Sequence, residues 1–459
     1  MPEVRRGQRL VAAVLAASLM PLNSTMIAVA LPDISHEFGQ DPSVVTQALV
    51  TSYLVAAVVL QSPAGKIGDR LGHSRMLAAG QVLVGAGALL GFLSPSVASL
   101  TAARVLMAAG GAVLVPATVA LLRHELPPER RGRAFGAFGA VMALAAAVGP
   151  LVGGELVSQF GWPSVFVANL PVLLVSATLA GLAGTPVRVP RGATPGFDWV
   201  GTVLLATALT SIVLGLRPEG AHPAPFLVAG GVLLVPFTLW ERRVRDPVVA
   251  FSLFRSAPFT AGTVLIAVQN LVMYALLFEV PLVAHDLLDL GARRTGQLLV
   301  SLMLAMVLVS PVAGRLADRL GARTVAVAGS LVALAGVVGL AVTDLTAPVQ
   351  IAVPLGLLGV GLGLTTPAAQ SASISAAPGE QAGMAAGIGS TMRYLGGLAG
   401  VAVMSLLLDV SGSRSAVVGE HRTLMVVFAG ALLVGLLCAA LLPAAQSRGS
   451  IRSRSNAET

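Results

Sequence analysis

The chain has 459 residues, of which 55% are hydrophobic and only 11% are charged, and its mean hydropathy is +0.85. Soluble globular domains carry about 25% charged residues, so this composition excludes an ordinary soluble domain and indicates a polytopic membrane protein. The single cysteine, Cys438, excludes a disulfide framework within the chain, and the net charge of +8 raises the question of nucleic-acid binding.

Fourteen apolar stretches follow one another along the sequence. Each is about 20 residues long and lacks strict alternation, so each predicts a transmembrane helix rather than a barrel strand. The basic N-terminus resembles a signal peptide, but its apolar run continues to Leu31 and many similar runs follow, which favours an uncleaved first span. The predicted helices are residues 10–31, 45–64, 76–94, 98–122, 134–157, 163–184, 198–216, 223–240, 258–283, 296–313, 324–343, 348–371, 383–408 and 423–442.

The distribution of basic residues orients these helices. With fourteen spans, 22 lysine and arginine residues fall in the loops on the side of both termini, and five fall in the opposite loops. The positive-inside rule then places both termini in the cytoplasm of a multi-pass protein of the cytoplasmic membrane. The same asymmetry accounts for the net charge, so nucleic acid is not expected as a partner.

Two loops on the predicted cytoplasmic side repeat a short pattern. "GKIGDRLGHSR" (65–75) follows the second predicted helix, and "GRLADRLGAR" (314–323) follows the tenth, 249 residues later. This offset corresponds to eight helices, and internal repeats are a common plan of transporters. The predicted fold is therefore an all-α membrane protein with two six-helix bundles, residues 10–184 and 258–442. Two extra helices lie in a linker, residues 185–257, and residues 443–459 form a cytoplasmic tail predicted to be disordered.

Several motifs together resemble the major facilitator superfamily, and within it the fourteen-span drug:proton antiporters. The two loops resemble its signature loop, "RVLMAAGGAVLVP" (104–116) the arginine motif of helix 4, and "GAVMALAAAVGPLVGG" (139–154) the antiporter motif of helix 5. "LNSTMIAVALPDI" (22–34), "GWPSVFVANLP" (161–171) and "FDWVG" (197–201) resemble motifs of the fourteen-span group.

This resemblance covers residues 10 to about 442 and implies the major facilitator fold. It also implies alternating access, with export of small amphiphilic, drug-like or antibiotic-like molecules in exchange for protons. No cofactor is expected, because the proton gradient supplies the energy. The expected partners are a small-molecule substrate, protons and membrane lipid, and a monomer is the default for this fold.

The signature loops predict a conformational latch. Their glycines allow tight turning at a helix end, and their aspartates can accept hydrogen bonds and pair with arginine. The alternative is a basic loop that only fixes topology, and His73 and Ser74 stand where the family usually has basic residues. The predicted latch residues are Gly65, Asp69, Arg70, Gly72 and Arg75, and in the second loop Gly314, Asp318, Arg319 and Gly321.

The antiporter motif places Gly149, Pro150, Gly153 and Gly154 in the fifth predicted helix. Small residues permit close helix contact and proline permits a kink, which suits a helix that seals one side of a cavity. Ordinary membrane packing is the alternative, because the chain has 51 glycines. "MAAGIGSTMRYLGGLAG" (384–400) resembles a counterpart in the second half.

Proton coupling requires a group that titrates within the membrane. The family's helix 1 motif has an aspartate where this chain has Asn23, and asparagine cannot carry a proton, so substrate contact or orientation of Arg104 is predicted for it. The resemblance implicates Arg104 in coupling. Glu279 is the predicted proton carrier, because subtracting the repeat offset places its helix on the cavity-lining first helix, and an apolar site disfavours a charged carboxylate. Its alternative is a carboxylate paired with water or Arg293, and Glu155 is the second candidate carrier.

A substrate cavity is predicted from polar side chains at membrane depth: Asn23, Gln269, Asn270, Tyr274 and Arg393. The alternative is that these groups only join neighbouring helices. The predicted cavity has two arginines, Arg104 and Arg393, against one or two glutamates, and the first helix has no aspartate. This balance predicts a weaker preference for dications than in relatives with more membrane acids.

Other functions remain as alternatives. An uptake symporter or a proton-independent facilitator would use the same fold, and Asn23 supports the facilitator. A membrane-embedded enzyme is a remote alternative, because no H-E-x-x-H or paired-aspartate motif appears and the six histidines are placed at span edges or in loops. No metal site or enzymatic activity is therefore expected.

Overall fold

The computed structural model describes residues 2–182, 198–215, 223–244, 247, 251–377, 382–410 and 412–444, and every regular element in these ranges is a helix. The first group of helices is α1 (Pro2–Met26), η1 (Ile27–Ala30), α2 (Leu31–Phe38), α3 (Pro42–Thr46), the π-helical η2 (Gln47–Thr51), α4 (Ser52–Leu71), α5 (His73–Phe92), α6 (Val97–Glu125), α7 (Pro128–Phe160), α8 (Ser164–Val167) and α9 (Asn169–Leu182). Two helices follow, α10 (Trp199–Gly215) and α11 (Pro223–Glu241). The last group is η3 (Phe251–Arg255), α12 (Ala257–Leu288), α13 (Ala292–Leu320), α14 (Ala322–Val342), α15 (Pro348–Ser375), α16 (Ala382–Leu407) and α17 (Arg414–Ala440).

The hydropathy prediction of membrane helices is confirmed. Among the described residues, thirteen helical segments are long and apolar enough to cross a membrane, and α10 adds a shorter apolar helix over Trp199–Ile212. Each of the fourteen predicted stretches coincides with one of these segments. The last helix begins at Arg414, earlier than the predicted residue 423. The Ser413 hydroxyl caps this start by accepting a hydrogen bond from the backbone N–H of Ala416.

Helix packing repeats between the first and last groups. Helix α6 packs against α5 and α4, as α15 packs against α14 and α13, and α1 packs against α7 as α12 packs against α16. Each partner in the second set lies eight spans after its counterpart in the first. The tail proposed for residues 443–459 falls almost wholly outside the described residues, as do residues 185–197 and 216–222 of the linker.

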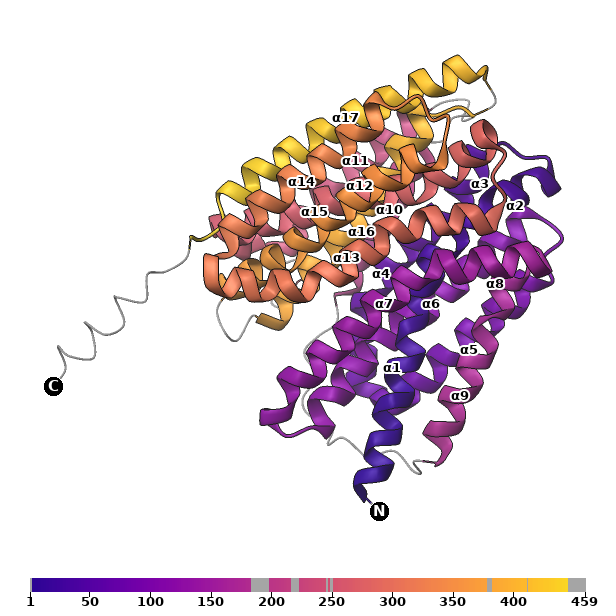
Figure 1. Cartoon of the computed structure of the whole chain (residues 1–459). Coiled ribbons are helices and arrows are strands. Elements are labelled where there is room, and N and C mark those ends of the chain that lie inside the picture. The colour runs from indigo at the N-terminus through magenta and orange to yellow at the C-terminus, as the bar shows by residue number, and fades with distance from the viewer. Residues whose placement is uncertain are drawn as a thin grey trace.

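The two groups meet along a contact surface that we call the seam. Helix α7 packs against α13, η1 packs against α12 and α13, and η2 packs against α16. We call the side where α1 begins and α17 ends the terminal side, and the opposite side the far side. Because η1, η2 and the C-terminal part of α7 all lie toward the far side, these contacts join the groups there. Figure 1 shows the groups α1–α9 and α12–α17 diverging toward the terminal side.

Candidate functional site

Arg104 is fully enclosed in the first group of helices. Its side chain on α6 is 2% exposed, and it donates from Nε to the carbonyl oxygen of Leu49 (3.1 Å) and from Nη1 to that of Asn23 (3.0 Å). Its guanidinium carbon lies 4.1 Å from the ring centroid of Tyr53, within cation–π range. Leu49 belongs to the π-helical turn η2, an irregularity often found at functional sites. Neutral carbonyls and an aromatic ring, all on the N-terminal group, therefore hold this charge.

The polar patch of α1 joins three different helices. The Asn23 amide donates to Asn169 Oδ1 on α9 (2.7 Å), and the Thr25 hydroxyl donates to the carbonyl of Ala146 on α7 (2.9 Å). Ser24 Oγ lies 3.2 Å from the hydroxyl of Tyr274 on α12, across the seam. The side chain of Asn23 is thus engaged by Asn169, and only its backbone carbonyl contacts Arg104.

All three tyrosines of the chain converge on residues 20–24 of α1. The Tyr53 hydroxyl on α4 donates to the carbonyl of Met20 (2.8 Å), and the Tyr394 hydroxyl on α16 lies 3.7 Å from the Met20 sulfur. Tyr274 completes the group through Ser24. Arg393, next to Tyr394, is half-buried, and its Nε has no hydrogen-bond partner among the described residues. The seam therefore carries aromatic hydroxyls and one cation.

Gln269 and Asn270 lie on α12 but do not join the seam tyrosines. Gln269 Oε1 accepts a bond from the Thr366 hydroxyl on α15 (3.1 Å), and the Asn270 amide donates to the carbonyl of Ile266 on its own helix (2.8 Å). Both are buried, so in this conformation they contribute to packing within the second group.

Glu279 on α12 and His421 on α17 form a buried pair. The carboxylate is 0% exposed and the imidazole 2% exposed, and Glu279 Oε1 is hydrogen-bonded to His421 Nδ1. The other ring nitrogen, Nε2, lies 3.2 Å from the carbonyl oxygen of Leu340 on α14. Successive residues of an α-helix are rotated by about 100°, so Glu279 lies about 140° around α12 from Tyr274. It therefore points into the second group of helices, away from α1, and its partner is His421, whereas Arg293 pairs with Glu155.

The prediction that all six histidines lie at span edges or in loops is wrong for His421. The cause is the early start of α17, because Arg414, Glu420 and Arg422 lower the hydropathy of its first turns. Helical spacing was the available signal. Buried positions 417, 421, 424, 425, 428 and 432 follow one face, and this pattern extends back from the apolar part of the helix through His421.

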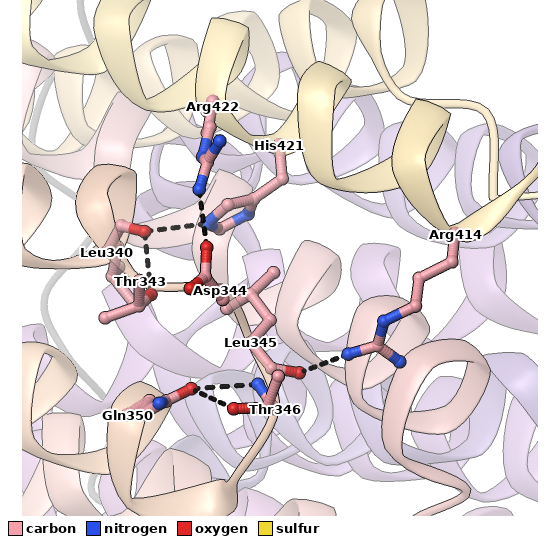
Figure 2. Close-up of polar contacts among 9 residues, drawn as sticks. All are labelled: Leu340, Thr343, Asp344, Leu345, Thr346, Gln350, Arg414, His421 and Arg422. Atoms are coloured by element: carbon pink, nitrogen blue, oxygen red, sulfur yellow. Dashed lines mark hydrogen bonds and ion pairs between the residues drawn. The ribbon is translucent and has the colours of Figure 1, made fainter.

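The far-side loop after α14 lies directly beside His421 (Figure 2). The Leu340 carbonyl also accepts a bond from the Thr343 hydroxyl (2.9 Å), and Arg422 pairs with Asp344 (2.8 Å). Arg414 donates to the backbone carbonyls of Leu287 (2.8 Å) and Leu345 (3.1 Å). One end of the loop is therefore fixed to α17 by two exposed arginines on either side of the buried histidine.

The antiporter motif lies at close helix contacts along α7. A methyl group on Gly149 would overlap with Thr25 Oγ1 on α1, and one on Gly154 would lie 2.6 Å from the carbonyl oxygen of Ala292 on α13. A methyl group on Gly153 would lie 2.8 Å from the carbonyl oxygen of Met26. Pro150 faces α13 as well, because its carbonyl oxygen would overlap with a methyl group on Gly296. These residues thus permit α7 to pack between α1 and the second group.

Glu155 extends this contact by pairing with Arg293 on α13 at 2.9 Å. The carboxylate is 40% exposed and the guanidinium 63% exposed, so the pair lies at the edge of the seam. In the second group, a methyl group on Gly396 or Gly400 of α16 would overlap with a carbonyl oxygen of α12. The same kind of close packing therefore occurs in both halves.

The signature loops are single-residue turns between helices. Gly72 joins α4 to α5 with φ of +92°, and Gly321 joins α13 to α14 with φ of +87°, values that favour glycine. Arg75 and Arg319 are exposed, and a methyl group on Gly314 would meet nothing within 4 Å. The side chains of the remaining predicted latch residues lie outside the described set: Gly65, Asp69, Arg70 and Asp318.

Two further features bear on binding. A cavity of about 270 Å³ between α10 and α16 has an apolar lining that includes Leu209 and Leu398, so it has no polar group to orient a substrate. Within the described ranges, no group of three or more His, Cys, Asp or Glu side chains could hold a metal ion.

The sequence matches the family model of the Major Facilitator Superfamily over residues 13–401. It is 32% identical to the tetracenomycin C resistance and export protein of Streptomyces glaucescens, covering 87% of this chain and 75% of that protein. It is 34% identical to the methyl viologen resistance protein SmvA of Salmonella typhimurium (90% and 84% covered) and 26% identical to the riboflavin transporter RibZ of Clostridioides difficile (84% of each). The fold resembles the crystal structure of a bacterial homolog of the human lysosomal transporter Spinster, with a TM-score of 0.70, 15% identity and coverage of 95% and 98%.

Proposed function

The chain belongs to the Major Facilitator Superfamily and is a transporter rather than an enzyme, and we propose that it exports small amphiphilic molecules in exchange for protons. Within the superfamily we assign it to the fourteen-span drug:proton antiporters, in the cytoplasmic membrane with both termini in the cytoplasm. The terminal side is then cytoplasmic and the far side extracellular. The 22-to-5 distribution of loop cations supports this orientation.

One observation carries the proton coupling: Glu279 and His421 are buried together in an apolar bundle. A coupling group must bind and release a proton inside the membrane, and the carboxyl group and the imidazole of this pair are both side chains that can gain or lose a proton. Arg104 is also buried, but arginine stays protonated and cannot take this role. The pair is therefore the proposed proton site, with Glu279 as the carrier.

The seam supports alternating access. Close contacts of α7 with α13 join the two groups on the far side, and the Glu155–Arg293 pair reinforces them. In an exporter, this arrangement would admit substrate from the cytoplasm while the extracellular side is sealed. The signature-loop residues are the proposed latch of the opposite state, in which the terminal side closes.

The polar groups of the seam suggest the substrate class. Tyr274, Tyr394 and Arg393 supply aromatic rings, hydroxyls and a positive charge on the side of the second group, and the acidic pair points away from them. We therefore expect neutral or anionic aromatic compounds to be exported better than dications. The names of the relatives include tetracenomycin C and methyl viologen, so they do not decide between these substrates.

A proton-independent facilitator or an uptake carrier is the second candidate. Asn23 supports the facilitator, because this position lacks the titratable group of the family motif, and one relative is named a riboflavin transporter.

Transport by purified protein in proteoliposomes with an imposed pH gradient tests the proposal. Neutral, anionic and dicationic aromatic dyes would be offered while internal pH is monitored with a trapped indicator. We expect gradient-driven movement of a neutral or anionic dye, coupled to counterflow of protons. Dye movement that is indifferent to the gradient would support the facilitator, and co-directional movement of dye and protons would support uptake.

A further inference from the structure

We propose that His421 is a second proton-binding residue, which shares one proton with Glu279 and connects the carrier to the far side. The inference rests on the proposed proton coupling and adds to it a residue, a protonation state and a direction of exchange.

The Leu340 carbonyl fixes the tautomer of the imidazole. A carbonyl oxygen can only accept a hydrogen bond, so Nε2, 3.2 Å away, must carry a hydrogen. Nδ1 is then left to face Glu279 Oε1. In the hydrogen-bonded state a single proton lies between these two atoms, either on Nδ1 as an ion pair or on Oε1 as a neutral pair.

Both arrangements have zero net charge, which suits an apolar site. Removing the shared proton leaves two acceptors facing each other and one uncompensated negative charge, which is costly in a buried site. The pair therefore retains its proton in the closed far-side state and releases it only when its surroundings change. Glu279 Oε2 is buried and has no hydrogen-bond partner among the described residues, which adds to the cost of a charged carboxylate and to the need for the shared proton.

The surroundings of His421 place this exchange toward the far side. The next residue, Arg422, is exposed and bonded to Asp344, which lies four residues after Leu340 (Figure 2). The other helices packed nearby add few charges. Helix α14 beyond Arg323 and all of α15 carry no acidic or basic residue, and α16 carries Arg393 near its middle. On α17, the charged residues around His421 are Arg414, Glu420 and Arg422.

A structural ion pair would have the same geometry, so the test must separate positioning from proton exchange. His421→Asn keeps an amide near the position of Nδ1 but cannot titrate. We expect it to preserve substrate exchange between equal pH values while reducing pH-driven export and substrate-induced proton release by about tenfold or more. His36→Asn is the matched control, because His36 is exposed on α2 and lies outside this pair.

Non-additivity provides the second criterion. If Glu279 and His421 act as one unit, the double variant with Glu279→Gln and His421→Asn should be no more impaired than Glu279→Gln alone. Coupling in the wild type together with an unchanged His421→Asn pH profile would overturn this inference alone. Substrate movement without proton movement in the wild type would instead overturn the proposed function.

The tautomer can be tested without transport. In ¹⁵N-histidine-labelled protein in lipid bilayers, the His421 signals are those lost in His421→Asn. We expect Nε2 to remain protonated at every pH and the Nδ1 shift to change over the same pH range as proton-coupled transport. A neutral His421 with its hydrogen on Nδ1 would contradict the geometry.

Discussion

Each half of the molecule contains a buried polar centre, and the two centres are built from different chemistry. In the first half, Arg104 is surrounded by neutral acceptors: two backbone carbonyls and the face of Tyr53. In the second half, Glu279 is paired with a titratable base, His421. Both centres are buried at 2% exposure or less, so burial alone does not distinguish a working proton site from a structural one.

The difference is whether the charge can change. An arginine keeps its charge at any physiological pH, so the carbonyls of Leu49 and Asn23 stabilise a permanent cation and hold α1, η2 and α6 together. The acid–base pair can exist in several protonation states of different net charge. We infer that the first half supplies a fixed framework and the second half supplies the coupling.

Among the variants that test this difference between the halves, Glu279→Gln should have the largest effect on transport. The amide is similar in size but cannot carry a proton, so pH-driven export should fall by about 100-fold or more, while exchange of substrate at equal pH persists. Transport of a fluorescent dye in proteoliposomes, with and without a pH gradient, measures both quantities. Full gradient-driven activity in this variant would remove Glu279 from the coupling role.

Arg104→Gln tests the other centre. Losing the cation leaves the carbonyls of Leu49 and Asn23 with weaker partners, and we expect a loss of about 2–4 kcal/mol in the free energy of unfolding. Because arginine does not titrate, the loss should be the same at pH 6 and pH 8. Unfolding in mixed micelles at the two pH values measures it. A strongly pH-dependent loss would mean that Arg104 is linked to a titrating group after all.

Gly154→Ala perturbs the seam rather than either centre. The added methyl group would meet the Ala292 carbonyl oxygen at 2.6 Å, and overpacking of this kind costs about 1–3 kcal/mol. In the proposed cycle α7 and α13 separate when the far side opens, so we expect the conformational equilibrium to shift about tenfold or more toward an open far side. Gly139→Ala on the same helix is the control, because a methyl group there meets nothing within 4 Å.

Spin labels on the two groups can report this shift. Ala98 and Ser415 are exposed near the far-side ends of α6 and α17, and replacing Cys438 by serine leaves only the introduced cysteines. Pulsed electron paramagnetic resonance should show a longer label-to-label distance in Gly154→Ala than in Gly139→Ala. Equal distance distributions would show that α7 and α13 do not set the closed state.

Sequence patterns predicted the features that depend on local chemistry. Hydropathy located the fourteen helical stretches, and the repeated glycines at positions 72 and 321 predicted two tight turns. Partners distant in sequence were not predictable, because the rotation of each helix is set by packing. Asn23 and Asn169 are 146 residues apart, and Glu279 and His421 are 142 apart. In addition, the charged residues Glu420 and Arg422 on either side of His421 lowered the local hydropathy, so His421 was not placed in the last helix.

Asn23→Asp makes the first half resemble the second by adding a titratable group, and its effect should be the smallest. The carboxylate would attract cationic substrates, so we expect resistance to a dicationic dye to rise by less than about tenfold, or 1.4 kcal/mol. Asn23→Leu is the control, because it also loses the bond to Asn169 but adds no charge. Growth of an efflux-deficient host across a range of dye concentrations and pH values measures the change. If the two variants behave alike, position 23 contributes only packing, which would support a first half that is a fixed framework and a second half that supplies the coupling.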